Sequence, residues 1–238
     1  MFRLLMLFVL LMTIVSTGCS QVTLTGSGNI VTQEEAISDF DKVDISHSFD
    51  VDIRQGDSFS VVIRVDDNLL EHLQVEKQGN TLKIGLKDNR NYTIQNATMQ
   101  AEVAMPGLTG VELSGASHGN IAGFRSSEDL SVDISGSSSL MGDIEAGDVR
   151  ADLSGSSEAT LSGAGENLTI DASGSSELNL SDFPVADTKI DASGASSVSV
   201  NVSGRLDVSA SGSSNVYYLG NPNLGTIDTS GSSSVEAK

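Results

Sequence analysis

Apolar and polar residues alternate along most of this chain, with the period of two that is typical of strands buried on one face. The alternation is clear in segments 43–53, 59–65 and 82–86. It continues through the second half of the chain, where short apolar groups return at regular intervals. The pattern therefore predicts an all-β protein.

Three stretches in the first half depart from the alternation. Residues 68–73 predict one helical turn, with Asp66 or Asp67 as its cap. Residues 88–97 are polar and predict a loop. Residues 20–29 are mostly Ser, Thr, Gly and Gln and predict a short tether in front of the first strand.

After Pro106-Gly107 the sequence repeats itself. Ser-Gly, followed by Ala or Ser and then another Ser, occurs seven times at steps of 18 to 21 residues. A flexible Gly/Ser linker would lack the apolar positions that return with every copy. One such copy cannot bury its own apolar side, so the copies are expected to stack and share a narrow core.

Each copy has an inner and an outer side. The residues three and one before the first Ser are mostly apolar and point to the same side of a strand, while the residue between them points outward. The glycine allows a corner with positive φ or close backbone approach. The predicted corner glycines are Gly115, Gly136, Gly155, Gly174, Gly194, Gly212 and Gly231. The last Ser of each copy, three residues after the first, runs from Ser117 to Ser233. Its hydroxyl is expected to tie successive corners together.

Two short strands per copy with identical corners predict a parallel β-solenoid (β-helix) with coils of about 19 residues. An up-and-down barrel is the alternative, but it would need a hairpin turn every ~8–12 residues. The expected organisation is an N-terminal β-rich part with a short helical turn at residues 30–106, which caps a solenoid at residues 107–238.

The first residues are typical of a signal peptide at 1–18. Arg3 precedes a nearly continuous apolar stretch from Leu4 to Val15, which is short for a membrane-spanning helix of ~20 residues. Ser-Thr-Gly-Cys resembles a bacterial lipobox, although Ser16 stands where Leu is preferred. The resemblance implies lipidation of Cys19, a tether over 19–29 and a membrane partner through the lipid anchor. An ordinary secretory signal is the alternative.

Charge and chemistry exclude several function classes. The net charge is −19, from 32 acids and 13 bases, which excludes sequence-neutral binding to nucleic acid. The three histidines, His47, His72 and His118, lack the spacing of metal ligands. The serines stand in corners rather than in a Gly-x-Ser-x-Gly elbow. No catalytic residue, no cofactor and no enzymatic activity are therefore expected, and the sequence gives no indication of an oligomeric state.

One outward position of the repeat carries an acid in consecutive copies. Asp133, Asp152, Asp171 and Asp191 should lie in a row, about 4.8 Å apart on stacked strands. Two arrangements are open. The carboxylates accept hydrogen bonds from corner serines and extend into solvent, or they share divalent cations such as Ca²⁺ with weak affinity. The second makes these residues candidate metal ligands.

An ordered set of segments carries a family resemblance. Gly26-Ser-Gly-Asn-Ile30, Phe40-Asp-Lys-Val-Asp-Ile45 and Val51-Asp-Ile-Arg-Gln-Gly56 come first, and Gly79-Asn-Thr-Leu-Lys-Ile84 and Met105-Pro-Gly-Leu-Thr-Gly110 follow. Together with the Ser-Gly repeat, this resembles the family called putative auto-transporter adhesin, head GIN domain, over residues 26–238. The resemblance implies an exported, often lipidated β-helix and transfers no catalytic residue to this chain.

Three functions of different classes are compatible with the sequence. The first is a non-catalytic envelope module that binds a glycan or protein partner on a flank of the solenoid. The second is a polysaccharide-active β-helix enzyme, although the repeats hold few basic residues to bind uronates. The third is a structural envelope protein without a specific ligand. Ser20 after Cys19 is not the Asp that retains lipoproteins at the inner membrane, so an outer-membrane location is expected.

Overall fold

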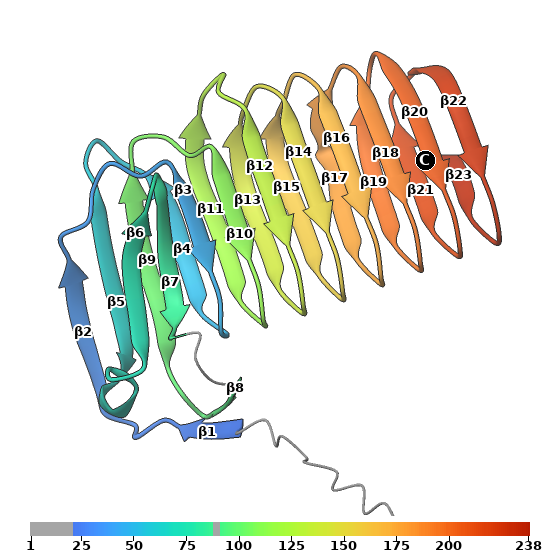
Figure 1. Cartoon of the computed structure of the whole chain (residues 1–238). Helices are drawn as coiled ribbons and strands as arrows, with labels where there is room; N and C mark the ends of the chain where they lie inside the picture. The colour runs from blue at the N-terminus through green and yellow to red at the C-terminus, as the bar shows by residue number, and fades with distance from the viewer. Residues whose placement is uncertain (1–20, 88–90) are drawn as a thin grey trace, which may run out of the picture.

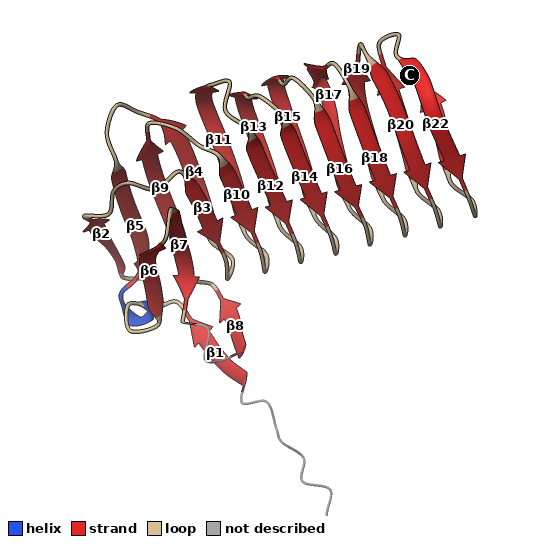
Figure 2. Cartoon of the chain, turned by 45° about the horizontal axis from the view of Figure 1, so that its top comes forward, coloured by secondary structure: helices blue, strands red, loops and turns tan. Residues whose placement is uncertain are grey.

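The computed structural model describes residues 21–87 and 91–238, and this part of the chain is all-β apart from one short 3-10 turn. Its strands form a small two-stranded sheet and two long sheets that run side by side along the molecule (Figures 1 and 2). Consecutive repeat copies pair in parallel, one coil on the next. The predicted parallel β-solenoid is therefore confirmed, and the up-and-down barrel is excluded.

The first long sheet, called sheet I, contains the strand that precedes the Ser-Gly corner of each coil. Its pairing is in register, so that Ile170 lies beside Ile190 and Asp171 beside Asp191. In spatial order its strands are β22 (Asn223–Thr229), β20 (Arg205–Ala210), β18 (Thr188–Ala192), β16 (Leu168–Ala172), β14 (Val149–Leu153), β12 (Leu130–Ile134), β10 (Gly110–Leu113), β3 (Lys42–Ile45), β7 (Thr81–Leu86) and β6 (Leu73–Gln78).

The second long sheet, called sheet II, contains the strand that follows each corner. Its strands in spatial order are β2 (Ile30–Glu35), β5 (Ser60–Asp66), β9 (Met99–Met105), β4 (Asp50–Gln55), β11 (His118–Arg125), β13 (Ser139–Glu145), β15 (Glu158–Ala164), β17 (Glu177–Val185), β19 (Ser197–Val202), β21 (Asn215–Leu219) and β23 (Ser234–Ala237). The inner side chains of the two sheets form the core between them.

The Ser-Gly corners depend on glycine for two reasons. All seven corner glycines have positive φ, which side chains disfavour. At Gly155, a Cβ would also lie 2.6 Å from the carbonyl oxygen of Gly136 in the preceding corner. Backbone hydrogen bonds then join corner to corner, as in Ser156 N–H to Gly136 C=O at 2.8 Å. The corner backbones therefore stack too closely for any other residue.

The last serine of each four-residue corner is buried from Ser117 to Ser214. Ser214 Oγ donates to the carbonyl of Ser211 in its own corner at 2.8 Å and to that of Ala192 in the preceding coil at 3.2 Å. Ser233 does the same with Ser230 and Ala210. The hydroxyls of Ser196, Ser214 and Ser233 thus tie successive corners as predicted. The hydroxyls of Ser157 and Ser176 have no partner in the structure.

The solenoid ladders continue across the boundary that the repeats place at residue 107. Strand β3 pairs in parallel with β10, and β4 pairs in parallel with β11, so residues 42–55 form a coil of their own. Its corner has His47 and Ser48 with φ of 63° and 64° in place of the Gly-containing corner. Without the Ser-Gly signature, the sequence did not identify this coil.

Beyond that coil lies an antiparallel end, called the N-terminal cap. Here β6 pairs with β7 and β5 pairs with both β2 and β9, all antiparallel. The helical turn predicted at 68–73 is a single 3-10 turn, η1 (Asp67–Leu69). Asp66 occupies the N-cap position, as predicted, but its side chain makes no capping bond. Its carboxylate instead accepts hydrogen bonds from the backbone N–H of Gly28 at 2.6 Å and of Thr98 at 2.7 Å.

Two segments that the sequence predicted as irregular are strands. β1 (Gln21–Thr25) lies in the expected tether and pairs in parallel with β8 (Asn91–Gln95), which lies in the expected loop. Leu24 in β1 is buried, and Val22 packs partly against the core. Each strand becomes regular only through its partner about 70 residues away in sequence, so local patterning missed both. The predicted signal peptide and Cys19 lie outside the described residues.

Candidate functional site: the acidic groove of sheet I

One outward position of sheet I carries a carboxylate in coil after coil. The strand register places these residues beside one another, and we call them the acidic row: Asp44, Glu112, Asp133, Asp152, Asp171, Asp191 and, after Ser209, Asp228. The structure thus brings the four predicted aspartates together. It adds Asp44, which the sequence missed because its coil lacks the Ser-Gly corner.

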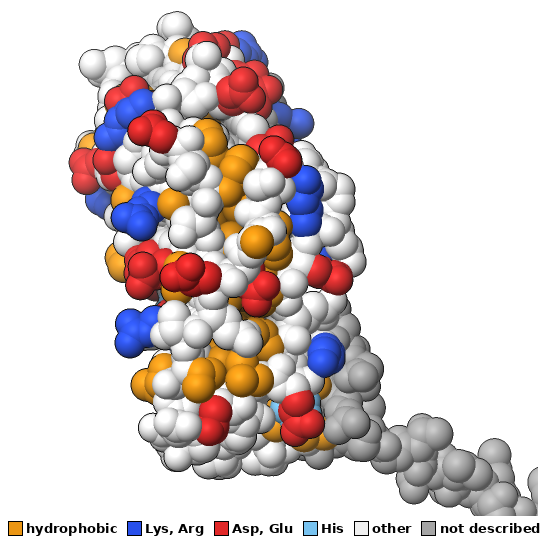
Figure 3. Space-filling model, turned by 90° about the vertical axis from the view of Figure 1, so that its left-hand side faces the viewer, with side chains coloured by type: hydrophobic (Ala, Val, Ile, Leu, Met, Phe, Trp, Pro, Cys, Tyr) orange, Lys and Arg blue, Asp and Glu red, His pale blue; other side chains and the backbone are white. Residues whose placement is uncertain are grey.

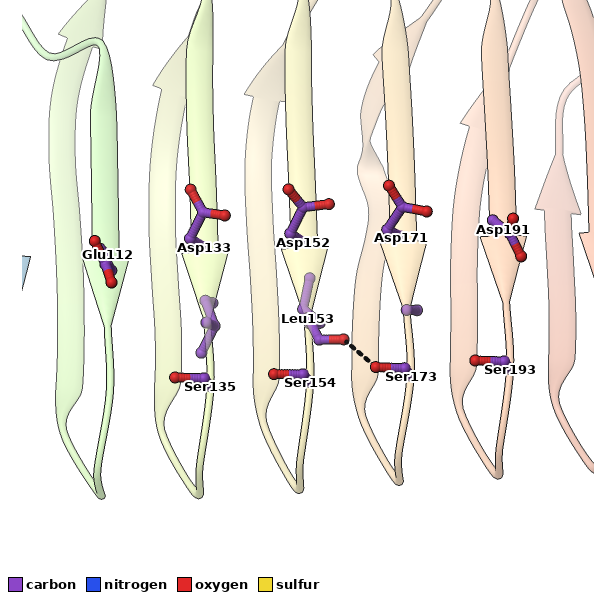
Figure 4. A pocket seen from close by; sticks show the side chains of 12 residues that line it. Glu112, Asp133, Ser135, Asp152, Leu153, Ser154, Asp171, Ser173, Asp191 and Ser193 are labelled. Carbon is purple, nitrogen blue, oxygen red and sulfur yellow. Dashed lines mark hydrogen bonds between the residues drawn. The ribbon is translucent and has the colours of Figure 1, made fainter.

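The acidic row lines a groove between the strands and the corners. The groove has a volume of about 550 Å³ and is lined from Glu112 to Asp191, with the corner serines Ser135, Ser154, Ser173 and Ser193 along its other side (Figure 4). The same two side-chain types repeat at each coil. The site is therefore a periodic strip along the solenoid axis rather than one enclosed pocket.

The hydrogen bonds of the row differ from those that the sequence predicted. Arg150, two residues before Asp152 on the same face, bonds both oxygens of Asp152 at 2.8 and 2.9 Å and Asp171 at 2.7 Å. Asp133 accepts from the strand residue Ser131 at 3.0 Å. The corner residue Ser173 instead donates to the carbonyl of Leu153 at 3.4 Å (Figure 4). Ser131 and Arg150 each lie two residues before the aspartate that they bond, on the same face of the strand.

The electrostatics of the row favour a positively charged occupant. Partial burial, followed by the charges of Asp44 and Asp133, raises the pKa of Glu112 above its ordinary value. Burial also raises the pKa of Asp152, and Asp133 and Asp171 add to this while Arg150 opposes it. Ionising either group thus costs free energy that a nearby cation would reduce.

The possible metal ligands among the described residues are dispersed. Among residues 21–87 and 91–238, no group of three or more His, Cys, Asp or Glu side chains is placed to hold one metal ion. The predicted sharing of Ca²⁺ along the row stays a prediction. His47 and His72 each contact the ring of Tyr92, with centroids 5.9 and 5.7 Å apart.

Sequence comparison places most of this architecture in one family. The family model described as "Putative auto-transporter adhesin, head GIN domain" matches residues 39–222, from the start of β3 and its coil through β21. The chain belongs to this family. No curated protein matches the sequence of this head GIN domain.

Solved structures share the fold of this head GIN domain at low identity. A putative adhesin from Bacteroides fragilis aligns with a TM-score of 0.82 and 16% identity, covering 90% of this chain and all of that one. A putative lipid binding protein from Parabacteroides distasonis has a TM-score of 0.75 and 21% identity over 91% of this chain and all of that one. A putative adhesin from Parabacteroides merdae has a TM-score of 0.68 and 18% identity, over 91% and 99% of the two chains.

Within the described residues, no helix is long and apolar enough to span a membrane. The neighbours are described as adhesins or a lipid-binding protein, and the family name likewise refers to adhesion rather than to an enzyme. At these identities the structures establish the common fold alone.

Proposed function

We propose that this protein is an exported, lipid-anchored module that carries out no chemistry and binds an extended basic segment of a partner protein along the acidic groove. The observation that carries the proposal is the groove itself, which presents one carboxylate per coil from Glu112 to Asp191. An extended chain laid along the solenoid axis would meet these charges at a regular spacing of about 4.8 Å.

The charge of the groove selects the class of partner. Anionic glycans and anionic lipid headgroups would be repelled by the carboxylates that line the groove. Lys or Arg side chains would instead stabilise the ionised forms of Glu112 and Asp152, whose pKa values are raised first by partial burial and then by neighbouring carboxylates. Arg150, which already bridges Asp152 and Asp171, is an internal example of such a contact.

The test uses residues 20–238, which contain every described strand, and fluorescent decalysine as the probe. Glu112→Gln with Asp133→Asn removes two adjacent charges of the row without touching Arg150. Glu158→Gln with Glu177→Gln removes two adjacent charges from the outer face of sheet II and is the matched control. We expect saturable, salt-sensitive binding that the first pair weakens about tenfold and the control leaves nearly unchanged.

Equal loss in both pairs would mean that only net charge matters, and the groove proposal would then be wrong. Saturable binding of a neutral glycan instead, abolished by the groove pair alone, would transfer the site to a glycan partner. Saturable cleavage of a polysaccharide by the wild-type protein would replace the binding module with the enzyme alternative. Envelope leakiness in a deletion strain that adheres normally would favour a structural role.

Lipid anchoring is proposed from the Ser-Thr-Gly-Cys segment and from the exported character of the family resemblance. We expect Cys19→Ser to leave full-length precursor and to abolish metabolic labelling of the protein with a palmitate analogue. Equal labelling of the variant and the wild-type protein would show that Cys19 is not lipidated. Fractionation of the envelope then tests the proposed outer-membrane location, because a protein recovered with the inner membrane contradicts it.

A further inference from the structure

A basic side chain already occupies the middle of the acidic groove. Arg150, in β14, donates to both oxygens of Asp152 at 2.8 and 2.9 Å and reaches Asp171 of the next coil at 2.7 Å. Figure 4 shows the carboxylates of Asp152 and Asp171 side by side on neighbouring strands. One guanidinium therefore bridges two members of the acidic row, in the way that a basic side chain of a partner would.

The members of the row on the side of the N-terminal cap have different neighbours. Lys83 in β7 continues the row in the strand register and bonds its first member at 2.9 Å. Glu112 and Asp133 come next along the stack. The residues two before them on the same face are Gly110 and Ser131, where β14 has its arginine. The negative charge of the row is therefore least neutralised at Glu112 and Asp133.

The groove also differs from the end of the molecule at the N-terminal cap. Figure 3 views this end and shows Lys and Arg side chains lying among acidic ones. The lining of the groove consists instead of carboxylates, corner serines and apolar strand residues. A single base that reaches the row from beside the groove, as Arg150 does, therefore changes the charge of the groove strongly.

The contact between Arg150 and the row can be broken at low cost. The side chain of Arg150 is 52% exposed, and exposed ion pairs contribute little to stability. Arg150 also lines a second recess, of about 540 Å³, together with Glu128, Asp129 and Asp148. A guanidinium that leaves the row therefore has other carboxylates to turn toward in this recess.

We propose that Arg150 is a built-in competitor for the groove, which an incoming basic segment must displace from Asp152 and Asp171. This rests on the proposed function, because it concerns the same groove and the same class of partner. The strand holds Arg150 beside the row, so its effective concentration there is high, on the order of millimolar. A ligand with one or two charges cannot displace it, whereas a polybasic segment gains more contacts than Arg150 loses. Arg150 thus restricts the groove to polybasic partners.

The length of a ligand decides how far its binding depends on Arg150. Four steps of about 4.8 Å separate Glu112 from Asp191, or roughly 19 Å along the solenoid axis. Extended decalysine spans roughly 34 Å and must cross the two aspartates that Arg150 holds. Dilysine spans roughly 7 Å and fits on Glu112 and Asp133 alone.

The test compares two arginines in matched surroundings. Arg205 bonds Asp207, two residues later on its strand, at 2.6 and 2.7 Å. The side chains of this pair are 56% and 30% exposed, against 52% and 31% for Arg150 and Asp152. Asp207 lines a different recess. Arg150→Gln and Arg205→Gln, made in residues 20–238, therefore remove the same charge and the same kind of ion pair, and thermal melting checks that both variants are folded.

We expect Arg150→Gln to bind fluorescent decalysine about fivefold more tightly than the wild-type protein does, and Arg205→Gln to stay within about twofold of wild type. Dilysine, measured as a competitor of decalysine, should change by less than about twofold in either variant. An equal gain in both variants would show that only net charge matters and would overturn the proposal. An equal gain for dilysine and decalysine would overturn the restriction to polybasic partners.

The failure of this proposal can be told apart from the failure of the proposed function. The proposed function fails if Glu112→Gln with Asp133→Asn leaves decalysine binding unchanged. The proposal for Arg150 fails if that pair weakens binding and Arg150→Gln does not strengthen it.

A titration of the carboxyl groups by NMR tests the contact without any ligand. Burial raises the pKa of Asp152, and the hydrogen bonds and charge of Arg150 oppose this rise. Arg150→Gln should therefore raise the pKa of Asp152 further, while Arg205→Gln should leave it at the wild-type value. If Asp152 titrates alike in both variants, Arg150 does not occupy the row in the free protein, and the proposal is wrong.

Discussion

The N-terminal cap and the repeat coils hold neighbouring chain segments together by different means. In the coils, backbone groups of one corner bond directly to the next, and small residues allow the approach. In the N-terminal cap, side chains hold irregular segments together: Asp66 bonds the N–H groups of Gly28 and Thr98, and Asp67 accepts from Ser27 at 2.6 Å. Asn68 adds a bond to the carbonyl of Thr25 at 2.9 Å.

The difference shows where the information for each region resides. A coil is specified by a local pattern that any copy can supply, because its partner is another copy of the same pattern. The N-terminal cap is specified by individual residues that meet only after distant segments have come together. Coils should therefore be sensitive to size and polarity at repeated inner positions, and the N-terminal cap to the loss of single polar groups.

The largest expected effect is a charge in the repeat core. Ile190 is 1% exposed and stacks on Ile170, so Ile190→Asp should lower the free energy of unfolding by about 3 kcal/mol or more. Ser139→Asp places the same carboxylate on the outer face of sheet II, in line with His118 and Glu158, and should be mild. Urea unfolding measures both. Similar losses for the two variants would show that the inner and outer sides are wrongly assigned.

The second largest effect is expected from replacing glycines, which should cost more stability in the coils than in the N-terminal cap. Gly155→Ala combines positive φ with a Cβ 2.6 Å from the carbonyl of Gly136, so we expect a loss of about 2 to 3 kcal/mol. Gly79→Ala in the turn between β6 and β7 has a similar φ of +62° but nothing within 4 Å, so it should cost about 1 kcal/mol. Thermal melting ranks the two. Equal shifts would mean that close stacking of corners contributes little.

Loss of one carboxylate should loosen the N-terminal cap. Asp66 is buried and accepts two backbone hydrogen bonds, so Asp66→Ala leaves both donors without their partner and should cost about 2 kcal/mol. The damage should be local. Hydrogen exchange is expected to rise around Gly28 and Thr98 and to stay unchanged in the coils from β14 onward. Faster exchange throughout would show that the two regions unfold as one unit.

The smallest effect concerns the acidic row and depends on pH. The pKa of Glu112 is raised, so its contribution to stability is full below its ordinary pKa and is lost as pH rises through the raised value. Glu112→Gln should therefore stabilise the protein at pH 7 by about a few tenths of a kcal/mol, since the group is largely exposed and screened. At pH 3 the variant and the wild-type protein should melt alike. A variant that is less stable at pH 7 would contradict the raised pKa.

The sequence predicted what repeats and missed what depends on a distant partner. The Ser-Gly steps placed the corners, and the inner positions around Ile170 and Ile190 followed from them. The coil at 42–55 was missed because His47 stands in its corner, and β8 because its only partner is β1. In the groove, the row of aspartates was visible in the sequence, whereas the bridge from Arg150 to Asp171 required the register of neighbouring strands.

Because the corners repeat, the length of the solenoid is set by the number of its coils. Each coil offers its successor the same register and the same backbone contacts, so a whole coil inserted between two others would recreate both junctions. Such a duplication would move the far end by one step of about 4.8 Å, while insertion of part of a coil would break the stack. The length of the solenoid can therefore change only in steps of one coil, and such a step needs no change in the residues of the core.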